Sequence, residues 1–258
     1  MTSFYYFTCL PRREHITGIK NADGQYIIFL DSDDYLYADN LPQLINTISK
    51  NKGEDFFIGR AYEFEDGTSD YKLCQVDYSK IKSQSPEEAF MELDCIDDFW
   101  FAAWLLIIKR EFLIENSLYF KKGIYHEDEL WVPSVFAKAR CFGFLNFGFY
   151  CYRLNRAGSI VSSPKIKREF DKLIIVNEFE TIKKMNKNSK EMLSRRQAAL
   201  IFGIILKLKS FEKEEEYLKL KKNLMENLFY LNHKKYRLIF VMVKLLGLKV
   251  TSNLLSIM

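Results

Sequence analysis

Apolar runs that end in polar, turn-forming residues recur along the first two thirds of the chain. The run at residues 26–30 is followed at once by three carboxylates, Asp31, Asp33 and Asp34. An uninterrupted apolar run of this length predicts a strand buried in a sheet. Ligands of open α/β sheets bind just beyond the carboxyl ends of the strands, so we expect these acids to face a cleft.

Two interpretations fit closely spaced carboxylates at such a position. One is a site for a hard divalent cation that bridges to a diphosphate. The other is a plain turn whose Asp residues cap the following helix. Asp39 or Asn40 also suits that cap, because apolar residues then recur at helical spacing, at Leu41, Leu44, Ile45 and Ile48. The pattern alone leaves both interpretations open.

More strands are predicted after this helix. Residues 56–58 form a second apolar run, and residues 60–65 alternate before a turn at 66–67. Residues 141–154 are rich in aromatic side chains and are interrupted by Gly143 and Gly148, which predicts two short strands there.

A capping box with proline at the first helical position occupies residues 85–88 and predicts a helix to about residue 93. Short strands and helices therefore alternate along this part of the chain. Such alternation is typical of the α/β fold class.

Beyond Pro164 the apolar spacing becomes helical throughout. We therefore expect two domains, residues 1–164 and residues 165–258. Helices are predicted over residues 170–185 and 192–208. Residues 212–229 are strongly charged, which predicts an exposed face, and residues 236–258 are apolar with scattered cations. No stretch reaches about eighteen uninterrupted apolar residues, which argues against a membrane-spanning helix.

Charge is distributed unevenly between these two parts. Residues 1–164 contain 17 basic and 24 acidic residues, whereas residues 165–258 contain 21 basic and 10 acidic residues. The net charges are −7 and +11, so we expect the second part to meet something anionic. A helix lying on an anionic membrane surface fits, as does a helical bundle with a solvated basic face. The basic residues form no recognised nucleic-acid motif, which argues against nucleic acid as a partner.

The composition is that of a globular protein, with 48% hydrophobic and 28% charged residues in 258. The five cysteines show no Cys-x-x-Cys spacing and are odd in number, which argues for a reducing compartment and against zinc. The apolar stretch at residues 4–10 is too short for a signal peptide. We expect a cytoplasmic protein, placed peripherally on the inner face of the cell membrane if its basic part binds lipid.

The segment GIKNADGQYIIFLDSDDYL, residues 18–36, resembles the Asp-x-Asp segment of family-2 glycosyltransferases, bacterial sugar transferases with the GT-A fold. That family carries Gly-Ile and Ala-x-Gly ahead of the strand and Asp-Ser-Asp-Asp at its end, matched here by Gly18, Ile19, Ala22, Gly24 and residues 31–34. By this resemblance Asp33, with Asp31 assisting, would hold Mg²⁺ or Mn²⁺ against the donor diphosphate.

Residues 125–129, Tyr-His-Glu-Asp-Glu, are similar to the family's Glu-Asp motif, which lies about a hundred residues after Asp-x-Asp. The resemblance implies that Asp128 is the base that deprotonates the acceptor hydroxyl, with Glu127 beside it in the acceptor site. The same acids also suit the first turn of a helix, because the helix dipole favours negative charge there. His126 would supply a metal nitrogen or shape the acceptor pocket, or is an ordinary polar residue.

Two further matches support the resemblance. A Trp, an apolar run, a basic pair and Phe-Leu precede the Glu-Asp motif in the family, as residues 104–113 do here. Trp104 would stack on an acceptor sugar, although packing with Trp100 in a core fits equally well. The family's Tyr-x-Tyr-Arg…Ser-Ile ending is matched by residues 150–153 and 159–160. Arg153 would pair with a phosphate, or is a surface arginine on a strand.

Taken together, the resemblance implies a partial GT-A (Rossmann-like) sheet with a helical C-terminal region. It implies metal-dependent, inverting transfer of a sugar from a nucleotide-diphosphate sugar, most often a UDP-sugar, to a glycan or lipid-linked acceptor. Capsule or surface polysaccharide synthesis is the family's common bacterial setting.

The resemblance begins only at about Thr17. Family members first carry strands that cradle the nucleotide, one of which ends in an Asp-Asp-Gly-Ser type motif, and residues 1–16 contain no such motif. We expect an N-terminally truncated chain, from a shifted reading frame, a misassigned start or a broken gene. The alternatives to an active transferase are a non-catalytic remnant with exposed strand edges and a membrane-associated interaction module.

Overall fold

The computed structural model describes residues 4–9, 14–65, 67–68, 70–74, 76–96, 99–154 and 165–256, with side chains from Gly18 onward. The chain divides into two compact units. The first, here called the sheet unit, comprises Met1–Gly123 and Glu127–Ser162; the second, the helical unit, comprises Ile124–His126 and Ser163–Met258. The expected match at residues 159–160 lies outside the described residues.

The sheet unit is built on one mixed sheet. Its strands are β1 (Phe4–Cys9), β2 (Tyr26–Asp31), β3 (Tyr35–Leu36), β4 (Phe56–Glu65), β5 (Lys72–Leu73), β6 (Leu106–Lys109) and β7 (Phe142–Leu154). They lie in the order β1-β2-β6-β4-β7-β3, and β5 pairs with β4. β1 and β2 are parallel, as are β4 and β7, whereas β6 runs antiparallel between β2 and β4. The predicted α/β class is confirmed.

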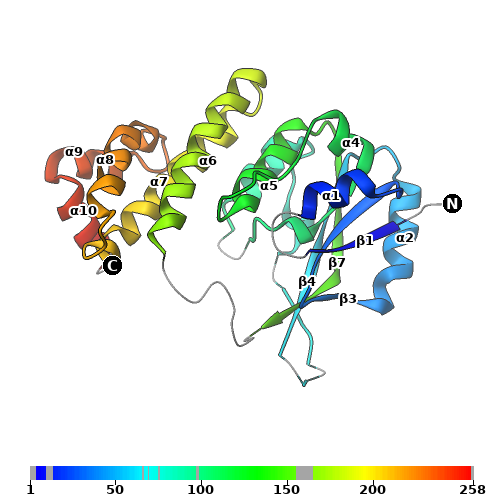
Figure 1. Cartoon of the computed structure of the whole chain (residues 1–258). Helices are drawn as coiled ribbons and strands as arrows, with labels where there is room; N and C mark the ends of the chain where they lie inside the picture. Colours follow the sequence, from blue (N-terminus) through cyan, green and yellow to red (C-terminus); the bar gives the residue numbers. More distant parts are fainter. Residues whose placement is uncertain are drawn as a thin grey trace. The chain divides into compact units, whose positions relative to one another are not determined.

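Helices cover the sheet: α1 (Glu14–Asn21), α2 (Leu41–Lys50), α3 (Pro86–Leu93), α4 (Arg110–Glu115) and α5 (Glu127–Lys138). Figure 1 shows α2 and α5 on either side of the strands. Trp131 and Phe136 of α5 meet Phe29 of β2 and Phe56 of β4 at ring-centroid distances of 5.2 and 4.8 Å. Burying one such ring stabilises the fold by roughly 1.5–3 kcal/mol, so this contact layer fixes α5, and with it residues 127–129, on the sheet.

Local signals place two helix starts. Ser85 accepts a hydrogen bond from the Glu88 N–H at 3.3 Å, with Pro86 in the first turn, so Ser85 caps α3 where the capping-box pattern predicted the helix start. Asn40 occupies the N-cap position of α2, one of the two predicted there, but its side chain makes no cap hydrogen bond and instead donates to the Gly148 carbonyl at 2.7 Å. The contact ties the start of α2 to β7, which no local pattern indicates.

The predicted pair of strands in residues 141–154 is wrong: β7 is one strand of 13 residues. A Cβ on Gly143 would lie 2.7 Å from the ring of Phe57, and one on Gly148 would lie 2.4 Å from the ring of Tyr62. Both glycines therefore let aromatic side chains of β4 cross the strand. They interrupt the apolar pattern without breaking the backbone.

The N-terminal residues contribute a strand that we did not expect. β1 pairs with β2 in register, from Phe4 opposite Tyr26 to Cys9 opposite Asp31, and α1 follows it. The strand edge expected to be exposed beside β2 is therefore covered. The aromatic sequence FYYFTC favours a strand although it carries no family motif.

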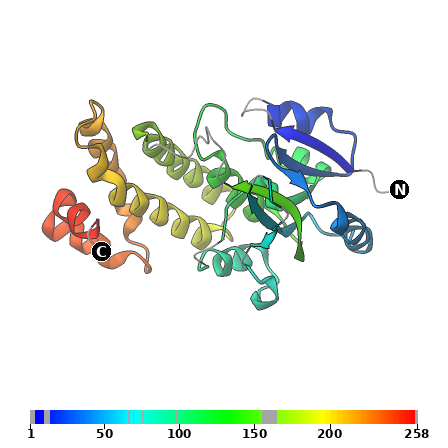
Figure 2. The same ribbon diagram turned by 90° about the horizontal axis from the view of Figure 1, so that it is seen from below.

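The helical unit contains α6 (Ile166–Met185), α7 (Lys190–Lys207), α8 (Tyr217–Asn227), α9 (Arg237–Leu246) and α10 (Leu248–Leu255), with 3-10 turns η5 (Leu208–Phe211) and η6 (Leu228–Leu231). Figure 2 shows α6 and α7 side by side. Within the apolar stretch that begins at Tyr236, Gly247, with φ +80, separates α9 from α10. Among the described residues, no helix is both long and apolar enough to cross a membrane.

Candidate active site

The acidic cluster lies where β2 ends. Asp31 is the last residue of β2, and the Asp34 N–H donates to the Asp31 carbonyl at 3.1 Å, which closes a turn that contains Asp33. β3 follows at once and pairs antiparallel with β7, Tyr35 opposite Cys151. The predicted strand and its acidic end are confirmed, and the following turn is held between two paired strands.

Asp34 anchors this turn. The Tyr150 hydroxyl donates to the Asp34 carboxylate at 2.8 Å and accepts the Asp31 N–H at 3.1 Å, while the Arg153 N–H donates to the other oxygen of Asp34 at 2.9 Å. Asp34 thus binds β7, and its role is structural. Sequence reasoning missed Tyr150 as the residue that positions Asp31; its only signal was the Tyr-x-Tyr-Arg match.

Asp128 lies in the first turn of α5, as the acidic start of 127–129 predicted. Burial, followed by the charges of Glu127 and Asp31, raises the pKa of Asp128 well above its usual value, opposed by a hydrogen bond from the backbone of Ala103. Burial and the charges of Asp34, Asp33 and Glu127 raise the pKa of Asp31 to about 6. Acids from β2 and α5, about a hundred residues apart in sequence, are therefore close enough for the charge of one to raise the pKa of the other.

The cluster carries an excess of negative charge in a poorly solvated place. Such a site gains a proton or a cation readily, because either one relieves repulsion between the carboxylates. Their hard oxygen atoms suit Mg²⁺ or Mn²⁺. Among the described residues, no group of three or more His, Cys, Asp or Glu side chains is arranged to hold a metal ion by itself. A cation would therefore need further oxygen ligands from water or a diphosphate.

Aromatic side chains flank the strand that carries Tyr150. Trp104 is 8% exposed, and its ring stacks on Tyr150 at 4.6 Å and on Tyr152 at 5.5 Å. Trp100 is partly exposed and meets Trp104 edge-on at 5.6 Å. The packing interpretation of Trp104 and Trp100 thus has direct contacts, and Trp100 presents the more accessible ring.

Arg153 and His126 are further predicted site residues. The guanidinium of Arg153 lies over the ring of Phe64 at 5.5 Å, and its charge is near Asp34. His126 has φ +60, so the backbone turns sharply just before α5 begins at Glu127.

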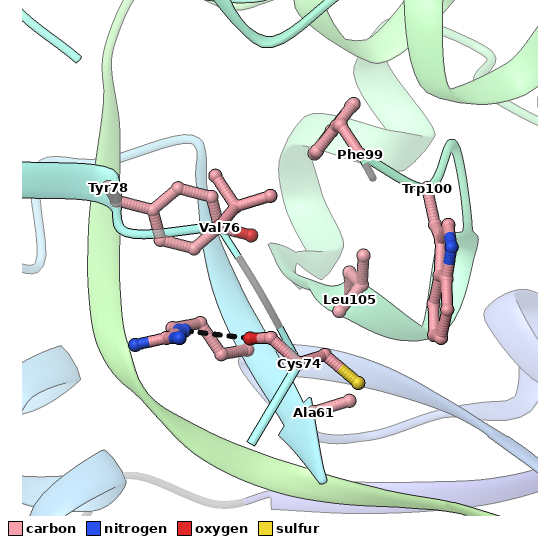
Figure 3. A pocket seen from close by; sticks show the side chains of 8 residues that line it. Ala61, Cys74, Val76, Tyr78, Phe99, Trp100 and Leu105 are labelled. Atoms are coloured by element: carbon pink, nitrogen blue, oxygen red, sulfur yellow. Dashed lines mark hydrogen bonds between the residues drawn. The ribbon is translucent and has the colours of Figure 1, made fainter. Parts of the chain in front are cut away.

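Figure 3 shows a small cavity beside β4, lined in part by Arg60, Tyr78, Phe99 and Trp100. Its volume is about 10 Å³, enough for about one water molecule. The Arg60 side chain donates to the Cys74 carbonyl at 3.0 Å within it. The cavity is a packing defect behind Trp100 and too small for a nucleotide or sugar.

Comparison with known proteins now bears on this arrangement. Residues 15–112 match the sequence model of the family described as Glycosyl transferase family 2. The chain is 26% identical over 159 residues to glycosyltransferase GlyG of Streptococcus pneumoniae, covering 60% of this chain and 50% of GlyG. It is 23% identical over 160 residues to TarS of Staphylococcus aureus, a poly(ribitol-phosphate) beta-N-acetylglucosaminyltransferase, covering 62% of this chain and 26% of TarS.

Solved structures agree on the fold. The crystal structure of S. aureus TarS residues 1–349 with UDP-GlcNAc matches with a TM-score of 0.64 and 16% identity, over 95% of this chain and 70% of that one. The chain spans about half the length of GlyG and about a quarter of TarS. The resemblance seen in residues 18–36 is confirmed: residues 15–112 match the model of Glycosyl transferase family 2, and the chain has the fold of GT-A glycosyltransferase structures.

Proposed function

We propose that this chain transfers a sugar from a nucleotide-diphosphate sugar to a glycan or lipid-linked acceptor. The observation that carries the proposal is the shared electrostatic field of Asp31 and Asp128, from two motifs about a hundred residues apart. The TarS structures contain UDP-GlcNAc or UDP, which supports a UDP-sugar as the donor. Capsule or another surface polysaccharide is the proposed setting.

Asp128 is the proposed base. A carboxylate with a raised pKa is a stronger base, and catalysis by proton transfer is most efficient when that pKa approaches the working pH. Asp128 takes the proton of the acceptor hydroxyl while the hydroxyl oxygen attacks the anomeric carbon of the donor sugar. Attack on the face opposite the leaving diphosphate inverts the configuration. Glu127 lies next to Asp128 at the start of α5, and its negative charge helps to raise the pKa of Asp128.

Asp33, with Asp31, is the proposed site for Mg²⁺ or Mn²⁺. The clustered carboxylates fit a divalent cation, which when bound would neutralise charge that develops on the leaving diphosphate. Tyr150 holds the backbone of Asp31 in place, so the acidic turn is ordered before any ligand arrives. Arg153 is proposed to meet a donor phosphate.

The acceptor site is proposed beside Asp128. Trp104 stacks on two tyrosines, so we propose that it supports the accessible ring of Trp100, which lies against it. Aromatic rings stack on the apolar face of sugars. His126 is the residue directly before α5 in the sequence, and its role in shaping an acceptor pocket stays a prediction.

The donor experiment is calorimetric titration of the whole chain with UDP and GDP, with and without Mn²⁺. Metal-dependent UDP binding is expected, and Asp33→Ala should abolish it. Asp23→Ala is the matched control, because Asp23 is exposed just before the opposite end of β2. A folded chain that binds neither nucleotide would overturn the proposal and favour the non-catalytic remnant. Unchanged binding by Asp33→Ala would refute the role of Asp33.

We also propose that α9 lies on an anionic membrane surface. Only Val243 of its ten residues is buried, while Leu238 and Leu245 are 72% and 78% exposed. Leu238, Val241 and Leu245 recur at helical spacing, with Arg237 and Lys244 among them. Apolar side chains flanked by cations suit the headgroup region of anionic lipids. The Borreliella burgdorferi relative is named a cholesterol galactosyltransferase, which supports a lipid as acceptor.

Flotation with vesicles of phosphatidylglycerol tests this surface. Leu238→Asp should weaken binding about ten-fold or more, since one buried leucine contributes roughly 1.5–3 kcal/mol. Leu218→Asp is the matched control, because Leu218 is 74% exposed on α8. Equal loss in both variants, or equal binding to neutral phosphatidylcholine vesicles, would contradict the proposal.

A further inference from the structure

The helical unit contains a cleft of about 420 Å³ that is distinct from the acidic cluster. Residues of α6 and α7 form one side, and η6 with the residues just after it forms the other. Volumes of roughly 300–1,000 Å³ are typical of small-molecule sites. We call it the helical cleft.

A connected polar network fixes its base. Lys183 is ion-paired with Glu180 and donates to the Gln197 side-chain oxygen at 2.7 Å and to the Ser194 hydroxyl at 3.3 Å. Gln197 is fully buried and donates to the Val176 carbonyl at 2.7 Å. A network satisfied in this way holds its side chains in one geometry. The base of the cleft is therefore pre-organised.

The rim is electrically balanced. Glu191 accepts from Lys234 at 3.2 Å and lies 3.3 Å from the ring nitrogen of His233, whose residue is 8% exposed. The hydrogen bond from Lys234 lowers the pKa of Glu191, so it is ionised at neutral pH. With the Lys183–Glu180 pair at the base, each lysine already faces a carboxylate. Such pairing disfavours a free phosphate or another strong anion.

An aromatic surface completes the cleft. Phe229 is 60% exposed, and its ring centroid lies 4.0 Å from that of Tyr230. Burial and the nearby Glu180 raise the pKa of Tyr230 to about 12, so its hydroxyl keeps its proton at neutral pH. An exposed phenylalanine beside carboxylates, amides and hydroxyls offers an apolar face together with donors and acceptors.

We infer that the helical cleft binds a neutral saccharide. A sugar ring has one apolar C–H face, which suits Phe229, and many hydroxyls that both donate and accept, which suits the paired Glu191 and Lys234. A phosphate lacks the apolar face. A purely apolar ligand would exclude water from the polar side chains of the cleft without offering them hydrogen bonds. The inference does not depend on transfer activity, because substitutions in the helical cleft separate sugar binding there from sugar binding in the sheet unit.

Saturation-transfer NMR of the whole chain with lactose, cellobiose and N,N′-diacetylchitobiose tests the inference. Saturable binding of at least one disaccharide is expected, unaffected by inorganic phosphate. Phe229→Ala should weaken it about ten-fold, which equals about 1.4 kcal/mol. Leu218→Ala is the matched control, as an exposed apolar residue of the same unit that does not line the cleft.

A second pair of variants tests the polar rim. Glu191→Gln should weaken binding, whereas Glu212→Gln should not, although Glu212 is also paired with a lysine, Lys249, at 3.3 Å. Absence of binding by a chain shown to be folded by circular dichroism overturns the inference. So does binding that survives both Phe229→Ala and Glu191→Gln, because the sugar would then occupy the sheet unit.

Discussion

Two groups of acids in this chain have opposite electrostatic surroundings. In the sheet unit, Asp31 and Asp128 lie among other carboxylates, and the pKa of each is raised. In the helical unit, Glu169 is 2% exposed but pairs with the buried Lys172 at 2.8 Å, with Lys207 at 4.0 Å. Neighbouring carboxylates add negative charge around the first group, whereas lysines neutralise the second within the fold.

The difference separates function from stability. Burying a lone carboxylate is costly, so a fold retains such a group where a ligand, cation or proton will relieve it. An acid that is already paired with a lysine needs no ligand to neutralise its charge. The comparison therefore supports the acidic end of β2 as the reactive place and assigns Glu169 a structural role.

The largest expected effect concerns catalysis. Asp128→Asn should lower turnover by about 10²–10⁴-fold, because the amide cannot accept the proton, while donor binding measured by calorimetry persists. Glu129→Gln is the matched control, since it removes one charge from the same turn of α5. Near-normal turnover by Asp128→Asn would show that Asp128 is not the catalytic base, and that its raised pKa does not mark a reactive group.

The compensated pair should respond in stability. Glu169→Gln leaves Lys172 buried without its carboxylate, and about 3–5 kcal/mol of unfolding free energy should be lost. Urea unfolding followed by circular dichroism measures the change. The control is Glu212→Gln, which breaks an exposed pair and should cost less than about 1 kcal/mol. Equal effects of the two substitutions would show that the buried pair is not special.

The first group of acids should make stability depend on pH. Between its ordinary value of 3.8 and its raised pKa of about 6, Asp31 holds a proton more firmly in the folded state than in the unfolded one. Stability should therefore fall as pH rises through this window, by about 2–3 kcal/mol for this group. Asp31→Asn should flatten that dependence and raise the urea midpoint at neutral pH. A midpoint that rises with pH in the wild-type chain would contradict the sign.

The smallest expected effect tests which lysine compensates Glu169. Lys207 is 57% exposed at 4.0 Å from Glu169, so Lys207→Ala should cost less than about 1 kcal/mol, far below the loss from Glu169→Gln. The same urea series measures both. A loss as large as that of Glu169→Gln would mean that the exposed lysine, and not Lys172, compensates the acid.

Local signals in the sequence predicted the parts of the fold that local contacts decide. The buried strand that ends at Asp31 and the helix capped by Ser85 depend on neighbours within a few residues. The continuity of β7 depends on rings of Phe57 and Tyr62, more than eighty residues away, so two glycines were misinterpreted as interruptions. β1 was not predicted, because its residues favour a strand but carry no family motif.

The candidate site follows the same rule. Spacing alone left Asp31 and Asp128 as separate acidic segments, and only the family resemblance predicted that they work together. The contacts that position them, from the Tyr150 hydroxyl and the Ala103 backbone, cross between elements and leave no pattern in the sequence.

The stack of Trp104 on Tyr150 and Tyr152 has an optical consequence. All three tryptophans of the chain, Trp100, Trp104 and Trp131, belong to the sheet unit. Fluorescence excited selectively at tryptophan therefore reports on the sheet unit alone, while most of the circular dichroism comes from helices in both units. Trp104 lies against the residue that holds Asp31, so its emission should change when the acidic turn binds a ligand and stay constant when only the helical unit unfolds.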